Sequence, residues 1–286
     1  MKFSENRKCP TKQAHLTDCW IIVTLYLRRR DTVPQNYKNE KFDLIIQAGQ
    51  SNAEGCGYGP IATPFEPSDR IIALDANLHF SRAGEKQQDQ KIISNFALAF
   101  ADLYVKNGFL SSDRKALILL NAVGGTGFSD NRWKTGDDLR EKLIASIRYA
   151  LNLNPENRAV VFLWHQGETD AGMNAAYDFY KKHFSDLLHC VRSECGNDNL
   201  PFICGDFVQN WKKTCLEQCR PVIQAQKDIC TADPHGRFVE TEGLSSNFEE
   251  NGPESPSDTG DIIHFSRQAL YTLGERYFTV FSDMNG

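Results

Sequence analysis

The sequence predicts an α/β protein, in which a three-layer α/β/α sandwich encloses a flavodoxin-like parallel sheet of about five strands. From Phe42 onward, short apolar runs alternate with segments of helical periodicity, which is typical of βαβ units. The runs are apolar at consecutive positions, as in strands that helices cover on both faces. Three of the runs end directly in small or polar residues, and parallel strands present such ends at one edge of the sheet.

The predicted strands are apolar runs bounded by polar or turn-forming residues. They cover residues 42–48, 70–74, 116–122, 159–164 and 201–206, with a weaker run near 237–240. Their lengths are those of ordinary strands. The order strand, helix, strand along the chain therefore indicates parallel pairing within one sheet.

The predicted helices carry apolar residues at intervals of three and four, which places those residues on one face. They cover residues 92–106, 137–152, 175–192 and 266–281, with a shorter segment at 221–229. Ser266 stands where a side-chain cap would begin the last helix. We expect the apolar faces to pack against the sheet and not to bind a cofactor.

The composition is that of an ordinary globular protein. The chain has 286 residues, of which 41% are hydrophobic and 24% charged, and this length buries a core without help from disulfides or metal. The formal net charge of −5 and the sequence pI of about 5.8 indicate no broad basic surface. We therefore expect no nucleic acid partner.

Nine cysteines are present, an odd number, so at least one is unpaired within the chain. The close pairs Cys190/Cys195 and Cys215/Cys219 lack C-x-x-C spacing and an accompanying histidine cluster. We expect reduced thiols that pack as small apolar groups, and no metal site.

Residues 1–41 are rich in Lys, Arg, Asn and Gln and predict an N-terminal extension before a domain that covers residues 42–286. Their one apolar stretch, residues 19–27, is far shorter than the ~20 residues of a membrane span. It follows a long polar lead and ends in three arginines, a poor match to a signal peptide. We expect no membrane partner and a cytoplasmic location.

Ser51 follows the first predicted strand, and His264 precedes the last predicted helix. Alone, Ser51 is better explained as a helix cap, and Asp261 and His264 can be a turn residue and a loop histidine. Together they offer a nucleophile, a base and, three positions before the base, a carboxylate that can orient the imidazole. The order Ser…Asp…His predicts an acyl-transfer site, although Ser51 does not lie in a G-x-S-x-G elbow.

An acyl-transfer site also needs hydrogen-bond donors for the oxyanion. Gly124 and Gly125 follow the third predicted strand and can expose backbone N–H groups, while Gln166 follows the fourth and offers an amide N–H₂. The N–H of Ser51 is a third donor. Each glycine could instead serve only a tight turn. The long loops at residues 53–69 and 243–260 are expected to wall the substrate.

Four short motifs occur in the order found in SGNH-type hydrolases. They are Gly49-Gln50-Ser51-Asn52-Ala53, Gly124-Gly125-Thr126, Trp164-His165-Gln166-Gly167-Glu168 and Asp261-Ile262-Ile263-His264-Phe265. More narrowly, residues 42–282 resemble the sialate O-acetylesterase-like branch, carbohydrate esterase family 6. The general SGNH pattern has Gly-Asp-Ser and a third-block Asn where this chain has Gly-Gln-Ser and Gln166.

The resemblance implies a Ser51, His264 and Asp261 triad, with oxyanion donors from Ser51, Gly125 and Gln166. It leaves Glu168 two roles, support of the glutamine loop or a second acid near the histidine, and we favour support. The other expected supporting residues are Gln50, Asn52 and Gly124.

The resulting prediction is a serine esterase that removes O-acetyl groups from a carbohydrate, with O-acetylated sialic acid favoured and no cofactor required. Two alternatives use the same triad: an esterase for acetylxylan or another polysaccharide, and an acyltransferase. A third is a carbohydrate-binding protein on the same scaffold without turnover. The residues leave the sugar and the oligomeric state open.

Overall fold

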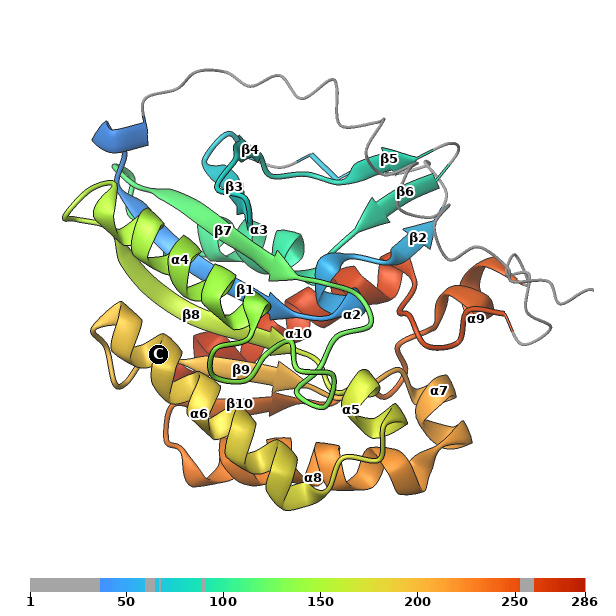
Figure 1. Cartoon of the computed structure of the whole chain (residues 1–286). Coiled ribbons are helices and arrows are strands. Elements are labelled where there is room, and N and C mark those ends of the chain that lie inside the picture. Colours follow the sequence, from blue (N-terminus) through green and yellow to red (C-terminus); the bar gives the residue numbers. More distant parts are fainter. Residues whose placement is uncertain (1–36, 60–64, 67, 89–90, 253–259, 286) are drawn as a thin grey trace, which may run out of the picture. The chain divides into compact units, whose positions relative to one another are not determined.

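The central sheet contains seven strands among the described residues, in the order β10-β9-β8-β1-β7-β3-β4 (Figure 1). The computed structural model describes residues 37–59, 65–66, 68–88, 91–252 and 260–285, all within one compact unit that begins at Gln35. The strands are β1 (Phe42–Gly49), β3 (Ile71–Asp75), β4 (Phe80–Arg82), β7 (Lys115–Ala122), β8 (Arg158–His165), β9 (Phe202–Gly205) and β10 (Gly236–Val239).

The predicted flavodoxin-like order is present in the five strands β7-β1-β8-β9-β10, which pair in parallel as second, first, third, fourth and fifth along the chain. The sheet is wider than predicted. β3 pairs in parallel with the outer side of β7, and β4 adds an antiparallel edge. β4 has three residues, none of them buried, so it carries no apolar run that a sequence pattern could detect.

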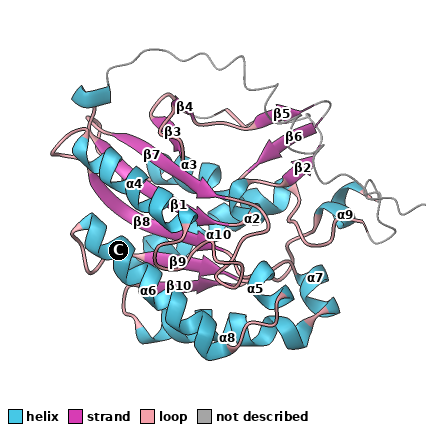
Figure 2. Cartoon of the chain, viewed as in Figure 1, coloured by secondary structure: helices cyan, strands magenta, loops and turns pink. Residues whose placement is uncertain are grey.

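Helices cover both faces of the sheet and make three layers (Figure 2). β1 is buried along its whole length. Leu44 and Ile46 face the core shared with α4 (Asp138–Asn152), α6 (Tyr177–Cys195) and α8 (Leu216–Ala232). Ile45, between them, faces the core shared with α3 (Phe96–Lys106) and α10 (Arg267–Asn285). Burial on both faces explains why the strands are continuously apolar. The predicted three-layer α/β/α fold is therefore confirmed.

The first predicted helix begins four residues later than expected. Lys91–Ser94 form β6, which joins β2 (Gly57–Gly59) and β5 (Lys86–Gln88) in a small antiparallel sheet. Asn95 then caps α3, because its side chain accepts a hydrogen bond from the N–H of Leu98 at 3.3 Å. The apolar residues of this strand happen to continue the helical spacing, so periodicity alone could not separate the two.

The predicted 221–229 helix is part of the longer α8, and Pro221 lies within its second turn. The predicted segment began at Pro221, because proline is usually tolerated only in the first turn of a helix. The short helix η1 (Tyr37–Asn39) was not predicted and precedes β1. Four further short helices that were not predicted follow strands: α2 (Ser51–Glu54), α5 (Glu168–Gly172), α7 (Gln209–Thr214) and α9 (Asn247–Asn251). The four helices α2, α5, α7 and α9 lie within the loops around the candidate site.

The described end of the predicted N-terminal extension packs on the domain. Tyr37 lies against Phe80, with ring centroids 4.2 Å apart, and Lys41 pairs with Asp113 and Glu156. The rest of the extension lies outside the described residues. No helix of the described chain is long and apolar enough to cross a membrane.

The seven cysteines within the described ranges are free thiols. Cys204 and Cys230 are buried with sulfur atoms 3.3 Å apart, and burial raises the pKa of Cys204 well above its ordinary value. Such thiols are unreactive at neutral pH. Among the same residues, no group of three or more His, Cys, Asp or Glu side chains is placed to hold a metal ion.

Candidate active site

Gly49 and Gln50 fix the turn that carries Ser51 out of the sheet. Gly49 has φ of 141°, and a Cβ at this position would clash with the carbonyl oxygen of His165 at the end of the neighbouring strand. The same carbonyl accepts the N–H of Gln50 at 3.1 Å. Only glycine permits this approach, and Ser51 then begins α2 at the carboxyl edge of the sheet.

The structure brings together the three residues predicted from distant parts of the sequence. His264 Nε2 lies 2.9 Å from Ser51 Oγ, and His264 Nδ1 lies 2.9 Å from Asp261 Oδ1. Figure 1 shows α2 and α9 beyond the arrowheads of the parallel strands, on the side where these residues meet. The hydroxyl, imidazole and carboxylate therefore form one continuous chain of hydrogen bonds.

The electrostatics of Asp261 define the histidine tautomer. Burial alone would raise the pKa of Asp261, but hydrogen bonds from His264 and Asn247 hold the pKa below its usual range. An ionised carboxylate only accepts hydrogen bonds, so His264 Nδ1 carries the proton. His264 Nε2 is then free to accept the proton of the Ser51 hydroxyl.

Asn52 links α2 by hydrogen bonds to the residues on both sides of His264. Its Nδ2 donates to Glu168 Oε1 at 2.7 Å and to the carbonyl of Ile263 at 3.1 Å, and its Oδ1 accepts the N–H of Phe265 at 3.0 Å. The side chain is fully buried. Its contacts therefore fix the backbone on either side of His264 relative to α2.

Glu168 lies under the site without a hydrogen bond to the histidine among the described residues. It is 2% exposed, its Oε1 accepts from Asn52, and its Oε2 has no partner in the described part of the chain. Burial raises the pKa of this carboxyl above its usual value. The contact with Asn52 is structural, and the supporting role of Glu168 stays a prediction.

The geometry corrects the expectation for Gln166. Its side chain is fully buried, and Nε2 donates to Asp170 Oδ2 at 2.7 Å and to the carbonyl of Thr126 at 3.1 Å. Its Oε1 accepts from Tyr180. Both amide hydrogens thus have internal acceptors, which leaves none for an oxyanion at Ser51. The sequence reasoning missed Asp170, four positions later, whose carboxylate draws the amide inward.

Gln50 offers a donor that was predicted only as support. Its Oε1 accepts hydrogen bonds from Gln166 Nε2, Gly167 N and Thr169 N at 3.2–3.3 Å. Three donors on one oxygen fix the plane of the amide. The opposite Nε2 group has no acceptor among the described residues. A glutamine directly before the nucleophile was the available sequence signal.

The glycine loop after β7 lies against Ser51. Gly124 N donates to Glu54 Oε2 at 2.7 Å, and a Cβ at Gly124 would lie 3.4 Å from Ser51 Cβ. Gly125 follows with φ of 70°, a left-handed conformation that favours glycine. Asp170 anchors the far side of the loop by accepting the N–H groups of Phe128 and Ser129 at 3.0 and 2.8 Å. The loop is therefore held at both ends.

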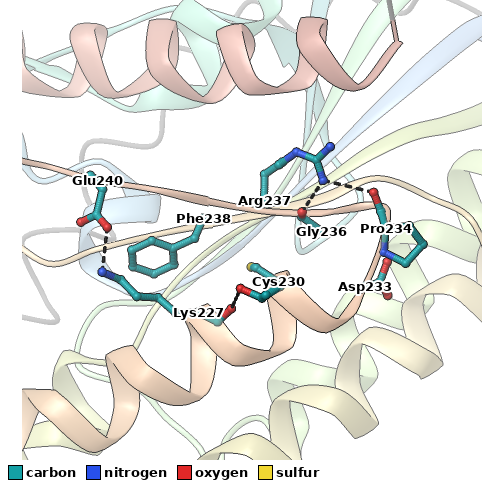
Figure 3. Close-up of a pocket in the computed structure, with 9 residues that line it drawn as sticks. Lys227, Cys230, Asp233, Pro234, Gly236, Arg237, Phe238 and Glu240 are labelled. Carbon is teal, nitrogen blue, oxygen red and sulfur yellow. Dashed lines mark hydrogen bonds and ion pairs between the residues drawn. The ribbon is translucent and has the colours of Figure 1, made fainter.

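A hollow of about 540 Å³ lies elsewhere, between α8 and the edge strand β10 (Figure 3). β8 and β9 separate β10 from β1, so this hollow contains none of the triad residues. Its charged groups are paired: Lys227 with Glu240 at 2.7 Å, and Arg237 with the carbonyls of Pro234 and Gly236. The cluster of Ser51, His264 and Asp261 therefore lies at the carboxyl edge of the sheet and outside this hollow.

The three-layer fold with its mostly parallel sheet is that of the SGNH hydrolases, as the motif order predicted. Residues 41–283 match the family model described as carbohydrate esterase, sialic acid-specific acetylesterase. The chain belongs to this family. The resemblance predicted from the four motifs is therefore confirmed.

Individual relatives are more distant. The chain is 32% identical over 90 residues to a probable 9-O-acetyl-N-acetylneuraminic acid deacetylase of Escherichia coli K12, and the match covers 29% of this chain and 27% of that protein. The crystal structure of NanS aligns with a TM-score of 0.69 and 19% identity, covering 85% of this chain and 97% of that one. A protein of Arabidopsis thaliana aligns with a TM-score of 0.63 and 17% identity, covering 84% and 98%. The two structural likenesses concern the fold.

Proposed function

We propose that this protein is a serine esterase that removes O-acetyl groups from a carbohydrate, with O-acetylated sialic acid as the favoured substrate. The observation that carries the proposal is the hydrogen-bonded chain from Ser51 Oγ through His264 to Asp261. Membership of the carbohydrate esterase family supports ester hydrolysis as the reaction. The family description and the name of the Escherichia coli relative support sialic acid as the sugar.

In the proposed reaction, His264 Nε2 takes the proton of the Ser51 hydroxyl as Oγ attacks the acetyl carbonyl. The carbonyl π electrons move to oxygen and form the tetrahedral oxyanion. When this collapses, the bond to the sugar oxygen breaks, and His264 returns the proton to the departing hydroxyl. Water then attacks the acetyl-enzyme by the same route, so that acetate leaves and Ser51 is restored. Asp261 holds the ring and stabilises the imidazolium that forms.

The proposed oxyanion donors are the N–H groups of Ser51 and Gly125 and the Nε2 of Gln50. Ser51 is the first residue of α2, so its N–H has no partner within the helix. Gly125 N–H likewise has no acceptor in the described part of the chain. We assign the side-chain donor to Gln50 in place of Gln166. The Oε1 of Gln50 accepts three hydrogen bonds that fix the amide, and its Nε2 has no acceptor among the described residues. Each such donor contributes about 10²–10³ in kcat.

The test combines covalent labelling with acetate release. Wild-type protein should react with a fluorophosphonate at Ser51 and release acetate from O-acetylated sialic acid faster than from acetylated xylan. Ser51→Ala should lose both activities, while Ser185→Ala, at an exposed serine on α6, should keep them. Undiminished hydrolysis of p-nitrophenyl acetate by Ser51→Ala would refute the proposed nucleophile. Sugar binding without labelling would favour a binding protein, and faster release from xylan would exclude sialic acid as the preferred sugar.

A further inference from the structure

Asn247, the first residue of α9, places a fully buried amide against the carboxylate of the triad. Its Nδ2 donates to Asp261 Oδ2 at 2.8 Å and to the carbonyl oxygen of Cys56 at 2.9 Å. Its Oδ1 accepts the N–H of Tyr58 at 3.1 Å. Both amide hydrogens and the amide oxygen are therefore engaged, and one of these bonds reaches the residue that orients His264.

The backbone at the start of α9 holds the same pair. The N–H of Asn247 donates to the carbonyl of His264 at 2.9 Å, and the N–H of Phe248 donates to the carbonyl of Asp261 at 2.9 Å. Ser246 caps this helix through a reciprocal capping box with Glu249. The capped start of α9 therefore binds the main-chain carbonyls of His264 and Asp261, and the Asn247 side chain binds the Asp261 carboxylate.

The three contacts allow only one orientation of the amide. A flipped Asn247 would set its oxygen against the Asp261 carboxylate and the Cys56 carbonyl, and its amino group against the Tyr58 N–H. Acceptors would then face acceptors, and a donor would face a donor, around an amide that is fully buried. The N–H of Tyr58 on β2 thereby makes the amide present a hydrogen to Asp261.

We propose that Asn247 is a positioning residue for the reaction, because its amide holds the Asp261 carboxylate in the plane and charge state that orient His264. This inference rests on the proposed function, since it needs Asp261 and His264 to act on Ser51. Among the described residues, the Asn247 side chain makes no hydrogen bond to Ser51 or His264. Its effect on turnover therefore passes through Asp261.

Other titratable groups lie near Asp261, near its neighbour Cys56 or on α9, and all of them are shared by the variants to be compared. They are His264, Cys56, Glu54, Glu168, Lys86 and, on α9 itself, Glu249 and Glu250. Burial raises the pKa of the Cys56 thiol to about 12, so it stays neutral across the working range. Differences in pH dependence between variants at position 247 and wild type thus report the changed residue.

Asn251 supplies a matched control. It lies one turn along α9 and donates to the carbonyl oxygens of Tyr58 and Asn247 at 3.1 and 3.2 Å, without touching Asp261. Asn251→Asp and Asn247→Asp each convert a side chain that binds the same β2 segment. Only the change at position 247 sets a second carboxyl against Asp261, where two acids must share one proton.

The experiment measures kcat and KM for p-nitrophenyl acetate between pH 5 and 9 for Asn247→Ala, Asn247→Asp and Asn251→Asp, with folding checked by circular dichroism and thermal melting. We expect Asn247→Ala to lower kcat about 10- to 100-fold with little change in KM, the factor that a hydrogen bond to a charged group is worth. The kcat of Asn247→Asp, taken as a fraction of the wild-type kcat at the same pH, should be higher at pH 5 than at pH 8. At pH 5 the protonated carboxyl still donates to Asp261, and at pH 8 the ionised carboxylate repels it. Asn251→Asp should follow the wild-type profile.

Three results would overturn the inference: an Asn247→Asp profile parallel to wild type, equal losses at positions 247 and 251, or a loss confined to KM. If Asn247→Ala does not fold, Asn247→Leu, which keeps a similar volume but has no donor, takes its place and must show the kcat loss instead. A Ser51→Ala variant as active as wild type would defeat the proposed function itself. An inactive Ser51→Ala with unaffected Asn247 variants would defeat only the positioning role.

Discussion

The buried His165 makes a sharp prediction about acid stability. It is the last residue of β8 and is fully enclosed, with ring neighbours Phe96 and Phe265. Its Nδ1 lies 3.0 Å from the hydroxyl of Tyr277, and its Nε2 has no partner among the described residues. Burial lowers the pKa of His165 from 6.5 to about 3. The folded protein thus resists protonation at a site where the unfolded chain accepts it.

The direction and size of the effect of acid on the free energy of unfolding follow from proton linkage. Below pH 6.5 the unfolded chain binds a proton at His165 that the folded chain refuses until the pH reaches about 3, so acid favours unfolding within this window. At pH 5 this costs about 2 kcal/mol of stability relative to pH 7. That is a large share of the ~5–15 kcal/mol that stabilises a typical domain.

His165→Phe removes the titrating group and replaces an unpartnered nitrogen with carbon. The assay is urea unfolding at pH 7 and pH 5. Wild type should lose about 2 kcal/mol more than His165→Phe between these pH values. His189→Gln, at an exposed histidine on α6, removes a histidine from the surface and should keep the wild-type pH dependence. Equal acid losses in wild type and His165→Phe would refute the reasoning.

Three further predictions concern the site. Gln50→Ala should lower kcat about 10²–10³-fold in steady-state acetate release with KM nearly unchanged, and a loss below tenfold would remove Gln50 from the proposed oxyanion hole. Gly125→Ala should destabilise by about 1 kcal/mol in thermal melts, because φ of 70° strains any residue with a Cβ although the surrounding space is open; an unchanged melting temperature would contradict this. Glu168→Gln should keep activity within about tenfold, since an amide oxygen can still accept from Asn52; a far larger loss in the same acetate assay would indicate a second acid.

The sequence predicted the sheet because its strands are buried on both faces, and this leaves continuous apolar runs such as residues 42–48. The triad residues were predicted for a similar reason. Ser51 follows a strand and His264 precedes a helix, where chain order and residue type carry the signal. The interpretation of 92–95 as helix was wrong because a strand and a helix of that length share one apolar pattern.

The remaining details depend on contacts between distant segments. Gln166 and Gln50 both carry amides at strand ends, and only the positions of Asp170 and Thr169 decide which amide faces inward. Asn247 belongs to a five-residue helix without an apolar stripe, so periodicity could not place it beside Asp261. Pairwise geometry of this kind has no local signature in the chain.

The turn at Gly49 has a consequence for how this enzyme scaffold can change. Main-chain contacts position Ser51. The N–H of Gln50 donates to the His165 carbonyl, and Gly49 approaches the same carbonyl closely. These main-chain contacts do not depend on the identity of most neighbouring side chains. The position of the Ser51 hydroxyl therefore depends on main-chain contacts at the end of β1, and it should tolerate substitutions in the surrounding loops provided that residue 49 remains glycine.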